Sequence, residues 1–222
     1  MTHTATQRST TLHSVELVHI TPKTEELISY MARVSNPSNQ SNTETSAKLI
    51  KYLIDHQHWS PFEMVNMCVE INTTRSIAAQ ILRHRSFSFQ EFSQRYADTN
   101  LLGDAKPFEL RYQDVKNRQA SIRDVNGELG NYFSDAIENC LANAQAVYDE
   151  MISKGVAKEC ARNILPLCSP TRLYMNGSIR SWLHYCDLRT GNGTQKEHAM
   201  IAGEVQDLLY DHLPNVCEAM WG

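Results

Sequence analysis

Hydrophobic residues recur along this chain with two different spacings. Where every second residue is apolar, as from Val65 to Ile71, the pattern is typical of a strand with one buried face. Where apolar residues lie three and four positions apart, as at Leu49, Ile50 and Leu53, the pattern predicts a helix with one buried face. The strands predicted in this way lie at 15–20, 65–71, around Phe87 and Phe89, near 108–112 and at 172–175. The predicted helices begin at Thr21 or Thr24 and run toward Val34, begin near Thr45, and span 74–85, 129–153, 157–164, 178–188 and 196–213.

These elements predict the fold class and the domain organisation. No internal repeat, low-complexity tract or linker rich in Pro, Gly or Ser divides the 222 residues. We therefore expect one domain, 1–222, of the α+β class. It should be dominated by helices around a small mixed or antiparallel sheet. The polar opening residues, 1–13, are predicted to form a flexible tail.

Composition and charge narrow the function classes. The formal net charge of −4 argues against a dedicated nucleic-acid binder, which is usually basic overall. No apolar run approaches the length of a membrane span, and no secretory signal is recognisable at the start, so we expect neither a membrane partner nor secretion. None of the six cysteines forms a C-x-x-C pair, so no zinc site is predicted and reduced thiols in the cytoplasm are expected.

The segment 83–96 has the most unusual composition of the chain. It holds three arginines, a histidine, a glutamate, three serines and two glutamines within fourteen residues. Arginine offers a fork of hydrogen-bond donors that matches phosphate and carboxylate groups, so this density suits a site for a small anionic molecule. A solvated helix end is an equally good explanation of the composition alone, because charge runs are usually solvated faces.

Other candidate groups surround this segment. His58 and Glu63 flank Ser60-Pro61 and could reach the same space, although a routine polar turn is the commoner explanation. If the helix continues past Leu82, Gln80, Arg83 and His84 share one helix face, which points either to a ligand or to solvent. The remaining candidates suit anion binding, namely the turn Ser93-Gln94-Arg95 and the two arginines Arg162 and Arg189. The motifs G-x-S-x-G, H-E-x-x-H and G-x-G-x-x-G are absent from the sequence.

Several of these motifs together resemble one enzyme family. R-H-R followed by seven residues and Ser, here Arg83-His84-Arg85 and Ser93, resembles the signature of the flavin-dependent thymidylate synthases. The segments H-x-S-P-F-E at 58–63 and A-R-V-S at 32–35 match that family in order, as do the R-x-x-L-P segment at 162–166 and Leu188-Arg189. Ordered matches over about residues 31 to 200 are far more specific than any single motif.

The resemblance implies a fold, a reaction and an assembly. It implies the flavin-dependent thymidylate synthase fold and a homotetramer with active sites where subunits meet. The family converts dUMP to dTMP, with methylenetetrahydrofolate as carbon donor, FAD as hydride carrier and NADPH as reductant, and needs no cysteine nucleophile. FAD carries the redox chemistry, while the protein supplies position and electrostatic field.

The resemblance also implies roles for individual residues. As catalytic residues it implies Arg189, which would stabilise negative charge on the base, His58 near flavin and folate, and Ser93, which would position dUMP. The implied flavin site comprises Ser35, His58, Ser60, Glu63, Arg83, His84, Arg85, Glu91, Ser178, His184, Leu188 and Arg189. The implied dUMP site comprises Gln80, Arg83, Glu91, Ser93, Gln94, Arg95, Arg162 and Arg189, from more than one subunit.

Two other interpretations of the same residues stay open at this point. In one, the arginine cluster binds single-stranded nucleic acid, with Phe87, Phe89, Phe92 and Tyr96 stacking on bases. The net charge of −4 weighs against it. In the other, the chain is a family member that binds flavin and has lost turnover.

Overall fold

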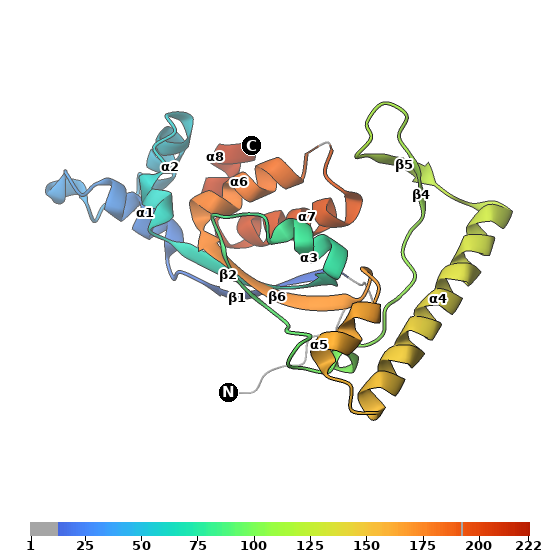
Figure 1. Cartoon of the computed structure of the whole chain (residues 1–222). Helices are drawn as coiled ribbons and strands as arrows, with labels where there is room; N and C mark the ends of the chain where they lie inside the picture. Colours follow the sequence, from blue (N-terminus) through green and yellow to red (C-terminus); the bar gives the residue numbers. More distant parts are fainter. Residues whose placement is uncertain (1–12, 192) are drawn as a thin grey trace.

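A four-stranded antiparallel sheet forms the centre of the molecule. The computed structural model describes residues 13–191 and 193–222, so almost all of the predicted tail lies outside the described residues. The strand order is β1 (Ser14–Ile20), β2 (Asn66–Thr74), β6 (Pro170–Ser178) and β3 (Ser88–Glu91), and each neighbouring pair is antiparallel. Figure 1 shows the long central strands β2 and β6 crossing the middle of the domain.

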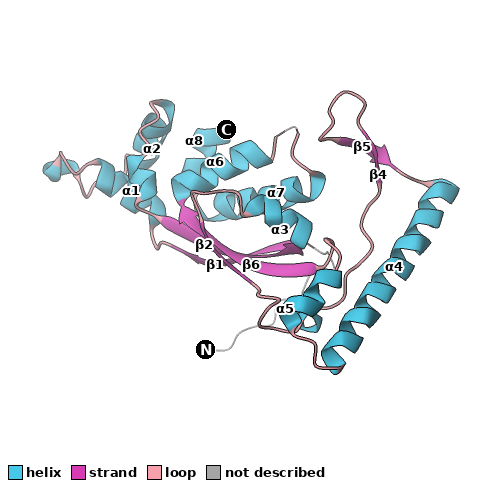
Figure 2. Cartoon of the chain, viewed as in Figure 1, coloured by secondary structure: helices cyan, strands magenta, loops and turns pink. Residues whose placement is uncertain are grey.

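Helices cover one face of this sheet and build the core with it (Figures 1 and 2). They are α3 (Arg75–Ile81), α6 (Ile179–Arg189), α7 (Lys196–His212) and α8 (Pro214–Trp221). Alternate strand residues point into this layer, and Met67, Val69 and Met175 are completely buried. Trp182 is completely buried as well, and its indole N–H donates to the Met67 carbonyl oxygen at 2.9 Å, which joins α6 to β2.

Two further helices pack at the other end of the domain. α1 (Thr24–Ala32) follows β1, and α2 (Ser46–Asp55) packs against α8. Short 3₁₀ turns, η1 (Pro37–Asn39) and η2 (Ser60–Glu63), lie on either side of α2 in the chain. The proline that opens η2 fits there because the first residues of a helical turn need no N–H donor.

The segment between β3 and β6 extends away from this core. It contains η3 (Thr99–Leu102), a hairpin of β4 (Arg111–Gln113) and β5 (Ser121–Asp124), the long helix α4 (Gly127–Ser153), α5 (Lys158–Ala161) and η4 (Arg162–Ile164). Figure 1 shows α4 standing at the edge of the molecule. Only Leu141 and Tyr148 of its 27 residues are buried, whereas Leu129, Tyr132 and Phe133 are exposed.

The α+β class and the small antiparallel sheet were predicted correctly from the hydrophobic pattern. Three details were wrong. The helix predicted over 74–85 ends at Ile81, so Arg83, His84 and Arg85 lie in the turn after α3 and do not share a helix face with Gln80. The strand near 108–112 is the first arm of the hairpin β4–β5, and the second arm has no buried residue that would mark it in the sequence. The last predicted helix stops at His212, and α8, which begins at Pro214, was missed.

Among the described residues, no helix combines the length and the apolar character that crossing a bilayer requires.

The packing around β6 gives a stability prediction. A Cβ at Gly177 would lie 2.5 Å from the ring of Phe87, which itself stacks edge-on against Trp182 with ring centroids 4.6 Å apart. We expect Gly177→Ala to lower the free energy of unfolding by about 1–3 kcal/mol, because the buried rings must shift. A Cβ at Gly203 in α7 would have no heavy atom within 4 Å. Gly203→Ala should therefore raise the free energy of unfolding by about 0.5–1 kcal/mol, since alanine is the better helix former. Urea unfolding measures both, and equal stability of the two variants would contradict the packing argument.

Candidate functional site

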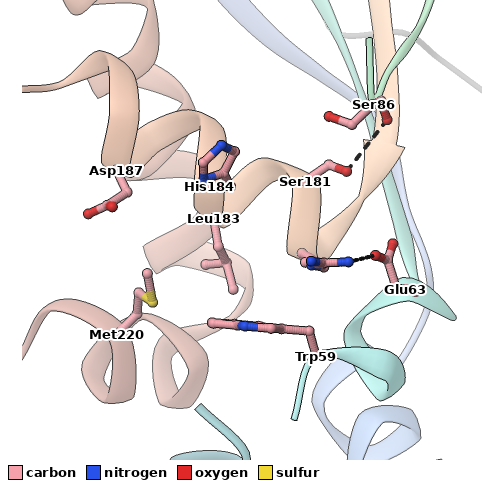
Figure 3. A pocket seen from close by; sticks show the side chains of 9 residues that line it. Trp59, Glu63, Ser86, Ser181, Leu183, His184, Asp187 and Met220 are labelled. Atoms are coloured by element: carbon pink, nitrogen blue, oxygen red, sulfur yellow. Dashed lines mark hydrogen bonds and ion pairs between the residues drawn. The ribbon is translucent and has the colours of Figure 1, made fainter. Parts of the chain in front are cut away.

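A cavity of about 440 Å³ opens between α6 and η2. Figure 3 shows Trp59, Leu183 and Met220 forming its apolar wall, while His184 from α6 and Glu63 from η2 supply polar groups. The first turn of α6 is set by Ser178, whose side-chain oxygen caps the helix by accepting from the N–H of Ser181 at 3.3 Å. An aromatic ring beside cationic and hydroxyl groups suits a planar polar ligand.

Glu63 binds two side chains at one edge of this cavity. It accepts hydrogen bonds from the hydroxyl of Ser178 and from the guanidinium of Arg180, each at 2.6 Å. These bonds, first from Ser178 and then from Arg180, hold the pKa of Glu63 below its ordinary value. The carboxylate therefore stays charged at neutral pH and fixes Arg180 at the cavity. The predicted flavin residues Glu63, Ser178 and His184 are thus brought together.

Arg180 was missed by the sequence analysis. It lies in the first turn of α6, where a cation is unfavourable because the helix dipole is positive there. A cation at the beginning of a predicted helix is the signal that could have identified it, since such a residue needs an acidic partner or a ligand nearby.

A second group lies where the turn after α3 meets the end of α6. Arg189 donates through Nε to Nε2 of His84 at 2.9 Å. Burial, the charge of Arg189 and then His184 lower the pKa of His84 to about 4. His84 is therefore neutral at pH 7 and accepts a hydrogen bond from the permanent cation Arg189.

Gln80 extends this second group toward α7. Its amide oxygen faces Nδ1 of His198 at 3.4 Å, and its amide nitrogen donates to Gln195 at 2.7 Å. His198 is completely buried, and its Nε2 lies 3.1 Å from the hydroxyl oxygen of Tyr185. Burial, and then the charges of Arg189 and His84, lower the pKa of His198 to about 4, so this ring is neutral as well. Gln80 was predicted as a site residue from the sequence, but His198 was not, because its position on a mostly apolar helix face gives no signal of a polar partner.

A third group lies beside η4. Arg75 and Arg162 line a hollow of about 290 Å³ together with Gln94, which is buried. Glu91 accepts from Arg75 at 2.6 Å and from the hydroxyl of Thr171 at 3.0 Å. Two predicted dUMP residues, Gln94 and Arg162, are therefore neighbours. The structure adds Arg75, which the sequence analysis did not select because it reads as an ordinary first-turn residue of α3.

Other predicted residues lie apart from these groups in the chain. Ser35 lines a shallow hollow near Thr45, and the His58 ring packs 6.0 Å from Tyr52 between ring centroids. The exposed Arg95 forms an ion pair with Glu159 at 3.1 Å. From the sequence, His58 and Glu63 could have reached the same space, although a routine polar turn was the commoner explanation, and in this chain each has other partners. The remaining predicted residues are solvent-exposed, namely Ser60, Arg83, Arg85, Ser93 and Leu188.

Comparisons with known proteins agree on one family. The family model described as thymidylate synthase complementing protein matches residues 16–215. A probable flavin-dependent thymidylate synthase of Paramecium bursaria Chlorella virus 1 is 48% identical over 196 residues, which cover 88% of this chain and 90% of that protein. A flavin-dependent thymidylate synthase of Synechocystis is also 48% identical over 196 residues, covering 88% of this chain and 89% of that protein.

A solved structure confirms the fold. The UMP/dUMP methylase PolB from Streptomyces cacaoi superimposes with a TM-score of 0.80 at 24% identity, over 93% of both chains.

The buried histidine in the second group predicts a pH dependence of stability. His198 has a pKa of about 4 when folded, against 6.5 for an ordinary histidine, so between these values only the unfolded chain takes up the proton. Lowering the pH from about 6.5 to about 5 should therefore cost about 1–2 kcal/mol of unfolding free energy through His198. Urea unfolding at a series of pH values measures this loss. The unfolding free energy should fall less steeply with decreasing pH in His198→Asn than in the wild type. An unchanged slope in that variant would refute the assignment of this pH dependence to His198.

Proposed function

Because the chain belongs to the thymidylate synthase complementing protein family, which includes the flavin-dependent thymidylate synthases, we propose that it converts dUMP to dTMP. Methylenetetrahydrofolate donates the carbon, FAD carries the hydride and NADPH supplies the electrons. The observation that carries the proposal is the pairing of Arg189 with neutral His84 at the end of α6, the same helix whose residues Leu183 and His184 line the cavity. One helix thus carries both a permanent cation and part of a site for a planar ring.

The residues around the cavity fit FAD. The dinucleotide has a flat apolar ring system and two phosphates, and the cavity offers Trp59 and Leu183 as apolar surface and Arg180 as a cation. Glu63 and Ser178 would hold Arg180 in place, and His184 would contribute a ring nitrogen. When bound, FAD supplies the hydride that reduces the pyrimidine. A volume of about 440 Å³ holds one part of so large a molecule, so the rest would extend over the exposed Arg83 and Arg85 or onto another subunit.

The third group fits the phosphate of dUMP. Arg75 and Arg162 line the same hollow as the buried amide of Gln94, and two guanidinium groups with an amide donor suit a dianion. Glu91 already neutralises part of the charge of Arg75 by an ion pair of 2.6 Å, so Arg162 is the stronger attractor for phosphate. Ser93 and Arg95 adjoin Gln94 in the chain and would add a hydroxyl and a third cation.

We assign to Arg189 the stabilisation of negative charge on the base. Adding a hydride to the uracil ring places negative charge on its oxygens, and a fixed cation there lowers the barrier. His84 accepts from Nε of Arg189, so the guanidinium is held in one orientation without losing its charge. Because the pKa of His84 is about 4, no second positive charge competes in this spot at neutral pH.

We propose a homotetramer in which subunits complete one another's active sites. Ser35, His58 and Arg95 lie away from the cavity within one chain, and α4 exposes Tyr132 and Phe133 on a helix that buries little in its own chain. Both facts are explained if a second copy covers α4 and brings these residues to a shared site.

The six free cysteines support the cytoplasmic location that we propose.

The stacking surface required for single-stranded nucleic acid is poorly formed. Phe87 is buried against Trp182, with ring centroids 4.6 Å apart, so it is not presented to a base. Tyr96, in contrast, is strongly exposed. Of the four aromatic residues that a binding module would use, Tyr96 alone is exposed, and the net charge of −4 also favours the enzyme over the binding module.

The visible spectrum of the protein mixed with FAD, followed by a dUMP titration, tests the proposal. A bound-flavin spectrum that shifts with dUMP, together with dTMP formation when methylenetetrahydrofolate and NADPH are added, is the expected result. No flavin uptake from excess FAD would overturn the cofactor assignment. Flavin and dUMP binding without dTMP formation would identify a member that has lost turnover.

Arg189→Ala should lower kcat by about 100- to 1000-fold, because a cation aimed at developing charge is removed. The variant should keep its thermal stability within a few degrees, since Arg189 is only partly buried. Steady-state kinetics and a thermal melt measure the two effects. Arg118→Ala, in the exposed turn of the β4–β5 hairpin, is the matched control and should turn over normally. Normal turnover of Arg189→Ala would show that the charge is stabilised elsewhere.

Tyr132→Glu in α4 should shift the protein from tetramer toward smaller species, because it places a charge in the apolar face that we expect to be covered. Sedimentation equilibrium over a range of concentrations measures the shift. Ala142→Glu, at an exposed position of the same helix that is turned away from the face of Leu129, Tyr132 and Phe133, should leave the mass unchanged. A wild-type protein that sediments as a monomer would refute the proposed assembly.

A further inference from the structure

A continuous chain of five polar side chains runs from the surface into the core through Gln80. Glu197 accepts from the amide nitrogen of Gln195 at 2.9 Å, and Gln195 accepts through its amide oxygen from Gln80 at 2.7 Å. The amide oxygen of Gln80 faces Nδ1 of His198 at 3.4 Å, and Nε2 of His198 lies 3.1 Å from the hydroxyl of Tyr185. α3, α6 and α7 each contribute to this chain.

The carboxylate at one end sets the direction of every bond. An ionised carboxylate only accepts, so Gln195 must turn its NH₂ group toward Glu197 and its oxygen toward Gln80. Gln80 must then turn its NH₂ group toward Gln195 and its oxygen toward His198. A neutral imidazole has one N–H, which must therefore sit on Nδ1 of His198. That leaves Nε2 to accept from the hydroxyl of Tyr185.

The protonation states of the chain agree with this direction. Burial pushes the pKa of Glu197 upward, but hydrogen bonds from Arg111 and Gln195 outweigh burial, and the pKa stays below its ordinary value. Arg111 reaches Glu197 at 2.8 Å. His198 is neutral at pH 7, because its pKa is about 4. Burial raises the pKa of Tyr185, so its hydroxyl keeps the proton that it donates.

We propose that this chain of five polar side chains, called the relay below, fixes Gln80 as a hydrogen-bond donor toward the substrate. Gln195, Glu197 and His198 act in it as positioning residues. The oxygen of Gln80 is turned to the completely buried His198, whereas its NH₂ group is turned to the exposed Gln195. A ligand that approaches from the open side therefore meets the donor end of the amide. The matching groups of dUMP are its acceptors, the phosphate oxygens and the ring carbonyls. The inference rests on the proposed function for its substrate.

A pair of variants at position 195 tests the relay. Lysine only donates, so Gln195→Lys forces the amide of Gln80 to turn round, and dUMP should bind to the FAD-loaded enzyme at least about fivefold more weakly. Glutamate only accepts, so Gln195→Glu keeps the direction, and affinity should stay within about threefold. Charge alone predicts the opposite order, because lysine attracts an anionic nucleotide and glutamate repels it. Calorimetric titration of dUMP measures all three proteins.

The outcomes separate the relay from the proposed function. Tighter binding by Gln195→Lys than by Gln195→Glu would overturn the relay. Arg111→Gln removes an ion-pair partner of Glu197 but keeps its carboxylate, so dUMP affinity should stay within about twofold. A larger loss would mean that the ion pair, and not the direction of the chain, holds Gln80.

A second readout needs no substrate. Nitrogen-15 NMR of labelled histidine should show the proton of His198 on Nδ1 in the wild type and on Nε2 in Gln195→Lys, with the signal assigned by its loss in His198→Asn. If the wild type binds no dUMP but the proton of His198 still moves from Nδ1 to Nε2 in Gln195→Lys, the relay is supported and dUMP is excluded as the substrate. A wild-type proton on Nε2 would overturn the relay even if dUMP binds.

Discussion

The attachment of α6 to the sheet is the constraint on which the rest of the site depends. α6 follows β6 without a loop. Where the strand ends and the helix begins, the backbone N–H of Ile179 donates to the carbonyl oxygen of Val65 at 2.9 Å. The indole of Trp182 then bonds the carbonyl of Met67 one turn further along. With one end of this turn fixed to Val65, just before β2, and the other to Met67 in β2, the helix cannot rotate about its axis. The exposed residues Arg180 and His184 and the half-buried Arg189 therefore keep fixed directions.

Polar groups inside the helical layer are arranged so that only one member of each contact carries charge. Arg189 faces the neutral ring of His84, and the neutral ring of His198 lies 6.2 Å beyond it, between ring centroids. Burial, and then the nearby charge of Arg189, disfavour the protonated form of either histidine, so the pKa values of both rings are depressed. With both rings neutral, the charge of Arg189 dominates the electrostatic field at the end of α6.

The sequence predicted the parts of the molecule that are governed by local spacing. β2 and α6 were recognisable because their apolar residues repeat with the period of a strand and of a helix. Glu63, Ser178 and His184 were selected through a family resemblance, and the structure places them around one cavity. Arg180 and His198 escaped notice because their importance comes from partners 117 and 118 positions away in the chain. The second arm of the hairpin, β5, was missed because all four of its residues are exposed, so no alternation marks it.

The exposed face of α4 has a consequence for how the protein behaves in dilute solution. A helix of 27 residues that buries two side chains in its own chain gains little from intramolecular packing. If a second copy covers it, part of its order is supplied by association, and mass action then makes the order of α4 depend on protein concentration. α5 and η4 follow α4 directly and carry Arg162, so the same dependence would reach the substrate side of the molecule. Specific activity would then fall on dilution even with all small molecules in excess, and the concentration of the protein would itself set how much of it is active.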